Sequence, residues 1–272
     1  MRWYVSIGAV LVAGAIAGGD VAGFAAPGPK SQFKTQFKNQ FEAAQPVQQQ
    51  AAPSVDVELI LAVDVSYSMD MDELAIQREG YAQAIVSKEF LQALKGLPNG
   101  KISVTYFEWA ASNDQKIIIP WRLIDGPETA DAVASEILKT PIRRASRTSI
   151  SGAIKFAVPL FDEDPYHGLR RVIDISGDGP NNNGAPVTGA RDAALEKGII
   201  INGLPILSEY EFLDDYYRDR VIGGAGAFME VVKDYSSFAA AVQAKLVREI
   251  AANETRAKEI LAEIGSAKGP PR

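Results

Sequence analysis

The sequence predicts an α/β fold: a doubly wound, mainly parallel central sheet with helices on both faces and one antiparallel edge strand. Three observations predict it. The run VELILAVDV at 57–65 is continuously apolar and of strand length, which is typical of a strand at the centre of a parallel sheet. Strand-like and helix-like segments then alternate along the chain. The strands expected at 101–110 and 115–124 are joined by a short polar loop, which indicates a hairpin and hence the antiparallel edge.

Helical patterns follow the first strand. A helix is expected from about Asp72, with Leu74, Tyr81 and Ile85 on one face. The apolar face then shifts, and Ser87 is placed to cap a second, short helix. Further along the chain we expect helices at 127–140, 148–161, 187–198 and 236–250, and strands at 199–207 and 227–234. Residues 170–179 are expected to be a strand that runs into a glycine-rich turn.

Composition narrows the function classes. The formal net charge is −6 and the basic residues form no long run, which argues against nucleic acid as a partner. The chain has no cysteine, so disulfides and thiolate metal sites are excluded. At 272 residues it can hold one domain of about 200 residues with extensions.

The first residues have the pattern of an export signal. Arg2 precedes an apolar stretch that runs to about Ala17 and ends in the small-x-small sequence AIA. We expect residues 1–17 to be a cleaved signal peptide, because GGD closes the run early. The alternative is an uncleaved membrane anchor. An exported, acidic, cysteine-free protein is expected in a bacterial periplasm.

Segments on either side of the expected domain at 55–252 differ from it in composition. Residues 18–54 are rich in Ala, Gly, Pro and Gln and are expected to be a linker. Within it, Phe33, Phe37 and Phe41 would share one face of a short helix. Residues 31–42 could contact a membrane surface or a partner, or simply form a solvated segment. Residues 253–272 are expected to be a helical or flexible tail.

The sequence DVSYS provides oxygen ligands where the central strand ends. Asp64, Ser66 and Ser68 form D-x-S-x-S, whose alternate side chains can turn toward one point. One carboxylate and two hydroxyls are hard ligands, suited to Mg²⁺, or to Mn²⁺ or Ca²⁺, rather than to zinc or copper. Two neutral hydroxyls leave such an ion short of negative charge, so a carboxylate from a partner would complete the site. Alone, this motif is weak evidence for a metal site, because serines after strands also serve as turn and cap residues.

Two later segments strengthen the metal hypothesis. Thr148 precedes an expected helix, and Asp178 follows an expected strand in ISGDGPNNNG. With these segments the chain resembles the von Willebrand factor A (VWA) family over roughly residues 55–252, and most of all an exported bacterial branch of unassigned role. The resemblance implies a Rossmann-like fold and a metal-ion-dependent adhesion site. The residues that match this site are Asp64, Ser66, Ser68, Thr148 and Asp178.

Two departures from the family pattern affect this site. Arg147 stands where family members usually have glycine, and Gly177 separates the strand from Asp178. Asp174, inside that strand, is a second candidate ligand, although a buried, paired aspartate is its expected role.

A set of residues around the site is expected to form its ligand rim. Each also has an ordinary interpretation, as a packed aromatic for the tryptophan and as turn residues for the asparagines. The candidates are Trp109, Asn113, Arg147, Asn181 and Asn182.

Three functions are open at this point. The first is a non-catalytic, divalent-metal-dependent module that binds a protein or other ligand through a carboxylate, in adhesion or assembly at the cell envelope. The second is a metal-assisted hydrolase, against which stand the absence of cysteine and a lone histidine, His167, without triad context. The third is a VWA-like scaffold with a vestigial metal site.

Overall fold

The computed structural model describes residues 54–251. The expected signal peptide, the linker with its Gln-Phe segment and the tail from residue 253 lie outside this range. Within it, no helix is both long and apolar enough to cross a lipid bilayer.

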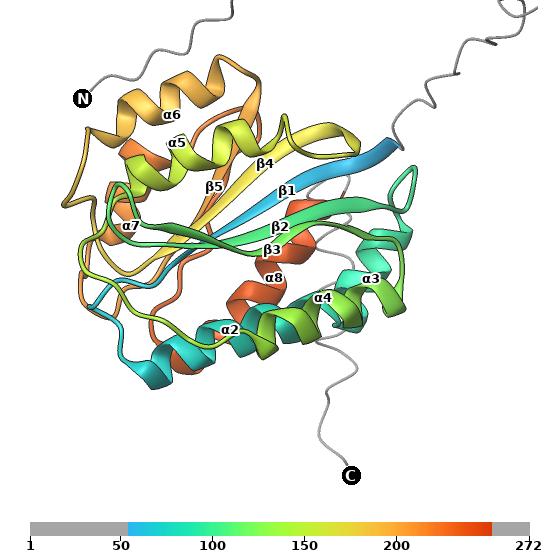
Figure 1. Cartoon of the computed structure of the whole chain (residues 1–272), viewed down its shortest axis with the longest axis horizontal. Coiled ribbons are helices and arrows are strands. Elements are labelled where there is room, and N and C mark those ends of the chain that lie inside the picture. Colours follow the sequence, from blue (N-terminus) through green and yellow to red (C-terminus); the bar gives the residue numbers. More distant parts are fainter. Residues whose placement is uncertain (1–53, 252–272) are drawn as a thin grey trace, which may run out of the picture. The chain divides into compact units, whose positions relative to one another are not determined.

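A five-stranded sheet forms the centre of the domain (Figure 1). Its order is β3 (Gln115–Ile124), β2 (Ile102–Trp109), β1 (Ser54–Asp64), β4 (His167–Gly177) and β5 (Ile199–Pro205). Strands β2, β1, β4 and β5 are parallel, and β3 pairs antiparallel with β2 at the edge. The predicted fold class is therefore confirmed, including its antiparallel edge strand.

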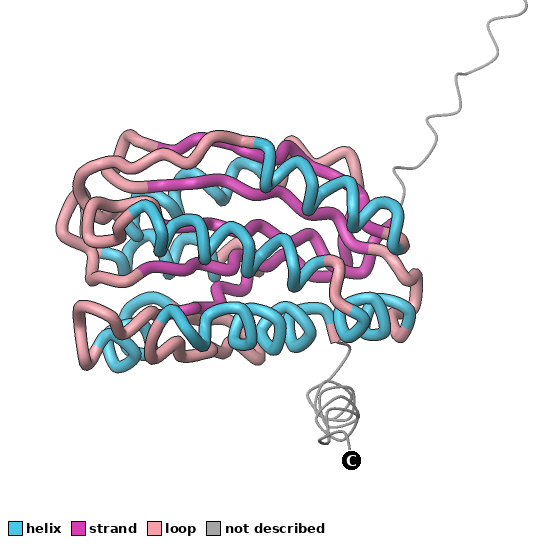
Figure 2. The backbone as a smooth tube through the Cα atoms, turned by 90° about the horizontal axis from the view of Figure 1, so that it is seen from below, coloured by secondary structure: helices cyan, strands magenta, loops and turns pink. Residues whose placement is uncertain are grey.

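Helices cover both faces of the sheet and lie above and below it in Figure 1, and the view from below in Figure 2 shows helices of one face lying across the strands. One face carries α2 (Met71–Ile85), α3 (Lys88–Lys95), α4 (Pro127–Lys139) and α8 (Phe238–Ile250). The other carries α5 (Ile150–Leu160), α6 (Val187–Leu195), α7 (Leu213–Tyr216) and the single-turn π-helix Tyr217–Val221. A short 3₁₀ turn, Tyr235–Ser237, precedes α8.

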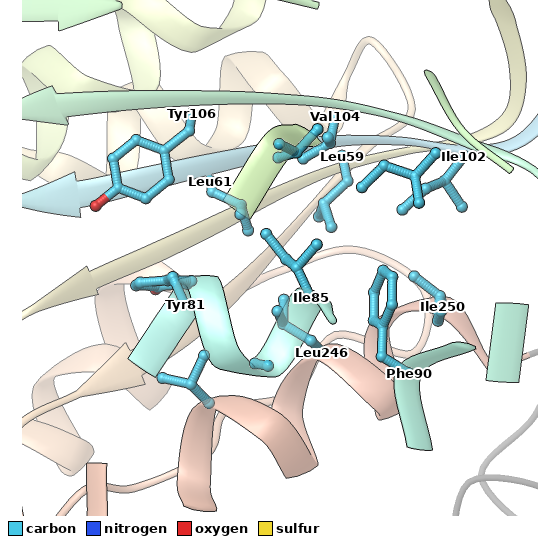
Figure 3. Packing of buried hydrophobic residues seen from close by; sticks show 14 of the residues in the cluster. Leu59, Leu61, Tyr81, Ile85, Phe90, Ile102, Val104, Tyr106, Leu246 and Ile250 are labelled. Atoms are coloured by element: carbon cyan, nitrogen blue, oxygen red, sulfur yellow. The ribbon is translucent and has the colours of Figure 1, made fainter. Parts of the chain in front are cut away.

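Strand β1 supplies both hydrophobic cores because its side chains alternate between the two faces. Leu59 and Leu61 pack toward α2, α3 and α8, where they lie near Tyr81 and Ile85 (Figure 3). Ile60, on the opposite face, belongs to the core beneath α5 and α6. Burial on both faces explains why this strand has a continuous rather than an alternating apolar pattern.

Caps fix where the helices near the candidate site begin. The side chain of Asp70 accepts hydrogen bonds from the backbone N–H groups of Asp72 and Glu73, and the Glu73 side chain accepts from Asp70 N–H. This capping box starts α2 directly after the serine-rich turn. Ser87 caps α3 as predicted, and Ser149 caps α5.

The strand predicted at 227–234 is wrong. This segment runs beside β5 but forms only isolated bridges, between Gly203 and Met229 and between Ile206 and Val232. Pro205 stands between these two contacts and has no amide hydrogen to donate, so a continuous ladder cannot form there.

Asp174 has the buried, paired role expected for it. Its Oδ1 lies 2.8 Å from Nζ of Lys245 on α8, and Lys245 also pairs with Glu249 one turn later. Asn202 on β5 donates to Glu249 Oε2 at 2.7 Å. All four side chains are buried, so this polar network joins α8 to the sheet.

Candidate metal centre

The sheet order places the ends of β1 and β4 next to each other. The chain leaves β1 toward β2 on one side and later returns to β4 on the other side, so the topology switches direction at β1. Loops that diverge from such a point leave a crevice beyond the carboxyl ends of the strands. Asp64 is the last residue of β1 and Asp178 follows the last residue of β4, so both lie at this crevice.

The D-x-S-x-S turn folds onto the loop after β4. Ser66 N–H donates to Asp64 Oδ1 at 2.8 Å, which bends the chain directly after the strand. The hydroxyl oxygens of Ser66 and Ser68 lie 3.0 Å apart, and the Ser68 hydroxyl donates to Asp178 Oδ1 at 2.7 Å. Four of the five predicted metal-site residues are thus linked in one hydrogen-bonded chain.

Thr148 is held at the same place by the loop after β4. Its N–H donates to Asn182 Oδ1 at 2.9 Å, and its carbonyl oxygen accepts from Asn182 N–H at 2.9 Å. Thr148 and the two serines line one cavity of about 210 Å³. The structure therefore brings all five predicted residues to one location.

Both aspartates are fully buried, and each has one oxygen without a partner. Oδ2 of Asp64 and Oδ2 of Asp178 make no hydrogen bond with any described residue. Burial raises the pKa of Asp178 to about 6, against the opposing effect of the Ser68 hydrogen bond. Burial, and then the charge of Asp178, raise the pKa of Asp64 well above its usual value.

These residues fit a hard divalent cation. Two carboxylates and three hydroxyls are oxygen donors of the kind that Mg²⁺, Mn²⁺ and Ca²⁺ prefer, and the two unpaired buried oxygens lack a positive partner. Over residues 54–251 no group of three or more acidic or histidine side chains is placed to hold a metal ion together. The protein would thus supply at most two negative charges, which leaves positive charge for a ligand.

Gly177, one of the two departures, permits the close packing of the site. A Cβ at this position would lie 2.9 Å from Asp64 Oδ2 and 3.1 Å from the hydroxyl of Tyr217. Any side chain there would displace Asp64, so the last residue of β4, directly before Asp178, has to be glycine.

Arg147, the other departure, adopts the conformation of the glycine it replaces. Its φ is +76°, and it is the one residue other than glycine with positive φ in the described range. The left-handed region costs energy for a side-chain-bearing residue. Arg147 is exposed and lines the cavity beside Thr148.

The other predicted rim residues differ in position. Trp109 was expected at the rim, which is wrong: it is fully buried in the core beneath α5, because the last side chain of β2 points inward. Asn113 is exposed on a neighbouring turn outside the cavity lining. The Asn181 side chain is used within its own loop and against Ser151, whereas Asn182 lines the cavity.

Two tyrosines at the cavity were missed from the sequence. Tyr67 lies inside the D-x-S-x-S motif and Tyr210 lies in the loop after β5, and both line the cavity. They are 59% and 49% exposed. Their positions just beyond the carboxyl ends of β1 and β5 were the signal that could have identified them.

Comparison with solved structures supports the fold assignment. The mussel byssus proximal thread matrix protein 1 is 14% identical, with a TM-score of 0.56 over 73% of this chain and 48% of that one. A further structure of that protein has a zinc-occupied MIDAS motif, the metal-ion-dependent adhesion site, with a TM-score of 0.50. A von Willebrand factor type A protein from Catenulispora acidiphila is 13% identical, with a TM-score of 0.53 over 72% of this chain and 43% of that one.

A pilus adhesin, SpaC from Lactobacillus rhamnosus GG, is also similar, at 16% identity and a TM-score of 0.50 over 79% of this chain and 31% of that one. This chain therefore spans less than half the length of each of these structures. No curated protein sequence matches it. A family model described as "Protein of unknown function (DUF1194)" matches residues 54–254. The domain has the VWA fold, and the chain belongs to the DUF1194 family.

Proposed function

We propose that this protein is a non-catalytic binding module, which uses a divalent cation to capture a carboxylate offered by a protein partner. Asp64, Ser66, Ser68, Thr148 and Asp178 would hold the ion, with Mg²⁺ as the expected metal and Mn²⁺ or Ca²⁺ as alternatives. When bound, the cation supplies the positive charge that attracts the partner's carboxylate.

The observation that carries this proposal is the pair of buried, unpaired oxygens on Asp64 and Asp178. Leaving a buried carboxylate oxygen without a partner is costly, and a cation removes that cost. The oxygens lie beside a cavity that the serines and Thr148 also line, so an ion held there would be reachable from outside.

A protein partner is favoured by the surface around the cavity. Tyr67 and Tyr210 are exposed on it, and Met71 and Phe212 are exposed within four residues of them in the sequence. Tyrosine and arginine are enriched among the residues that dominate protein interfaces. The matrix and adhesin proteins with similar folds support the same interpretation. An envelope location is proposed from the signal pattern of residues 1–17.

The position of the lone histidine argues against one route to hydrolysis, general-base catalysis by His167. His167 begins β4 and is exposed, whereas the metal centre lies beyond the other end of that 11-residue strand. At about 3.3 Å per residue the strand separates the two by roughly 30 Å. His167 therefore cannot act as a base at the proposed ion.

A surface-binding experiment tests the proposal. Full-length protein is passed over carboxymethylated dextran and over plain dextran, in Mg²⁺ and then in EDTA. We expect retention only on the carboxylate surface and only with Mg²⁺, because the ion would bridge protein and carboxylate. An acidic protein has little affinity of its own for such a surface, since like charges repel.

Two variants sharpen this test. Ser68→Ala removes one expected ligand and should weaken retention, whereas Ser135→Ala, on the exposed face of α4, should leave it unchanged. Retention that survives EDTA, or that is equal on both surfaces, would refute metal-bridged carboxylate binding.

A further inference from the structure

Three arginines precede Thr148 in the chain, and two of them are already occupied. Arg143 forms ion pairs with Glu108 and Asp114, at 3.1 and 2.7 Å. Arg144 donates to the carbonyl oxygen of Tyr67 at 2.7 Å, and its guanidinium lies 5.3 Å from the centre of the Tyr67 ring. These two arginines therefore have structural partners in the loops around the cavity.

The third, Arg147, has no such partner. Its guanidinium makes no hydrogen bond or ion pair with any residue in the described range 54–251. Among the residues that line the cavity it is the only charged one. It would therefore place a free cationic group beside the proposed metal.

The backbone of Arg147 is fixed in an unfavourable conformation from both sides. Ala145 N–H donates to the Val65 carbonyl oxygen at 2.9 Å, and Thr148 N–H donates to Asn182 Oδ1 at 2.9 Å. Between these anchors the chain has to take a φ of +76°, which glycine adopts freely. Folding alone would favour glycine here, so the arginine side chain needs a reason outside the fold.

Charge is arranged unevenly around the centre. Glu73 at the start of α2 and Glu209 after β5 both lie near enough to raise the pKa of Asp178. These two carboxylates would repel an anionic group beside the metal, whereas Arg147, which lines the cavity, would attract it.

We propose that Arg147 binds a second carboxylate of the ligand, so that the site selects a partner surface with two neighbouring acidic groups. The planar guanidinium can accept a carboxylate with two parallel hydrogen bonds, which a point charge cannot do. This inference rests on the proposed function, because the first carboxylate is the one held by the metal.

Matched small acids test the inference. The affinity of the full chain for Mn²⁺ is measured from the electron paramagnetic resonance signal of the free ion, with succinate or its mono-amide succinamate present. In a second pair, glutarate and glutaramate, the chain between the two end groups is one carbon longer. We expect at least one diacid to increase Mn²⁺ affinity roughly three- to tenfold more than its mono-amide does, as for a partly exposed ion pair.

Arg147→Gly is the decisive variant because glycine suits this backbone. It should unfold at a temperature no lower than the wild type and should lose the diacid preference, while Arg147→Lys should keep part of it. Arg122→Gln is the matched control, since it removes one positive charge at the other end of the sheet. It should keep the full preference.

The outcomes separate the two proposals. Equal effects of diacids and mono-amides in the wild type, or a preference that persists in Arg147→Gly, would overturn the role of Arg147 and leave the metal proposal intact. Absence of Mn²⁺ binding, or of any effect of the acids on it, would overturn the proposed function itself and this inference with it.

Discussion

Asp64 and Asp178 determine the electrostatics of the candidate metal centre. Both are fully buried, and the hydrogen bonds from Ser66 and Ser68 replace only part of the hydration that each carboxylate loses. In the metal-free protein their ionised forms are therefore disfavoured. A cation that neutralises them should bind and stabilise the fold together.

The pKa of Asp178 gives a prediction for the pH dependence of stability. Burial raises it to about 6, above the value of about 3.9 for an unfolded chain. A raised pKa means that the protonated form stabilises the fold below pH 4, and that this contribution is lost as the pH rises through 6. Two pKa units correspond to about 3 kcal/mol.

Asp178→Asn isolates this effect. In EDTA, the variant should gain stability over the wild type by up to about 3 kcal/mol between pH 4 and pH 7, measured by urea unfolding. In excess Mg²⁺ the advantage should shrink or reverse, because only the wild type binds the ion. A stability difference that does not change with pH would contradict the cost assigned to Asp178.

Several properties of single residues could not be predicted from the sequence. The requirement for Gly177 comes from Asp64, 113 positions earlier, and becomes visible only when β1 and β4 lie side by side. Trp109 ends β2 next to a polar loop, and only the sheet orientation shows that it points into the core. That the five candidate ligand residues come together was predictable, because each belongs to a motif at a strand or helix end.

At the level of elements, helix α8 is tied to the sheet by a buried polar network. Lys245 lies between Asp174 on β4 and Glu249 on its own helix, with Asn202 on β5 as a further partner of Glu249. Burial raises the pKa of Asp174 to about 7 and Lys245 opposes that rise. The network therefore depends on the charge of one lysine.

Lys245→Met should destabilise the domain by about 3–5 kcal/mol, because it leaves two buried acids without a cation. Urea unfolding at pH 7 measures this change. Lys155→Met, on the exposed face of α5, is the matched control and should have little effect.

A second comparison tests whether charge, rather than packing, is responsible for this loss. Adding Asp174→Asn and Glu249→Gln to Lys245→Met removes the unpaired charges and should restore most of the lost stability. If the triple variant is as unstable as Lys245→Met, the lysine acts through its packing and not through its charge.

At the scale of the molecule, the sheet topology assembles the candidate metal centre. Residues 64–68, 148 and 178 are far apart in the sequence, and the parallel arrangement of β1 and β4 brings the segments that carry them to one edge. This convergence was predictable, because alternating strands and helices form a parallel sheet, in which the carboxyl ends of the strands lie at the same end of the sheet. Residues 227–234 form isolated bridges and not the strand that we predicted. Their apolar pattern does not reveal that Pro205, on the neighbouring strand, interrupts the ladder.

The conformations of the loops around the cavity depend on contacts between loops, and the sequence does not show these contacts. Tyr210 reaches the cavity from the loop after β5, and Asn182 reaches Thr148 from the loop after β4. Such cross-loop contacts follow from loop conformation and not from strand order, so the rim was only partly predictable.

Calorimetric titration of the full chain with Mg²⁺, Mn²⁺ and Ca²⁺, beside Asp64→Ala, tests the central claim most directly. We predict saturable binding of at least one ion at a single site in the wild type, and a folded Asp64→Ala variant that binds none. Asp64 contributes one of the two carboxylates and belongs to neither hydrophobic core, so its loss should abolish the site while the domain stays folded. Absence of binding in the wild type, with succinate present to complete the site, would contradict the account and favour a vestigial centre.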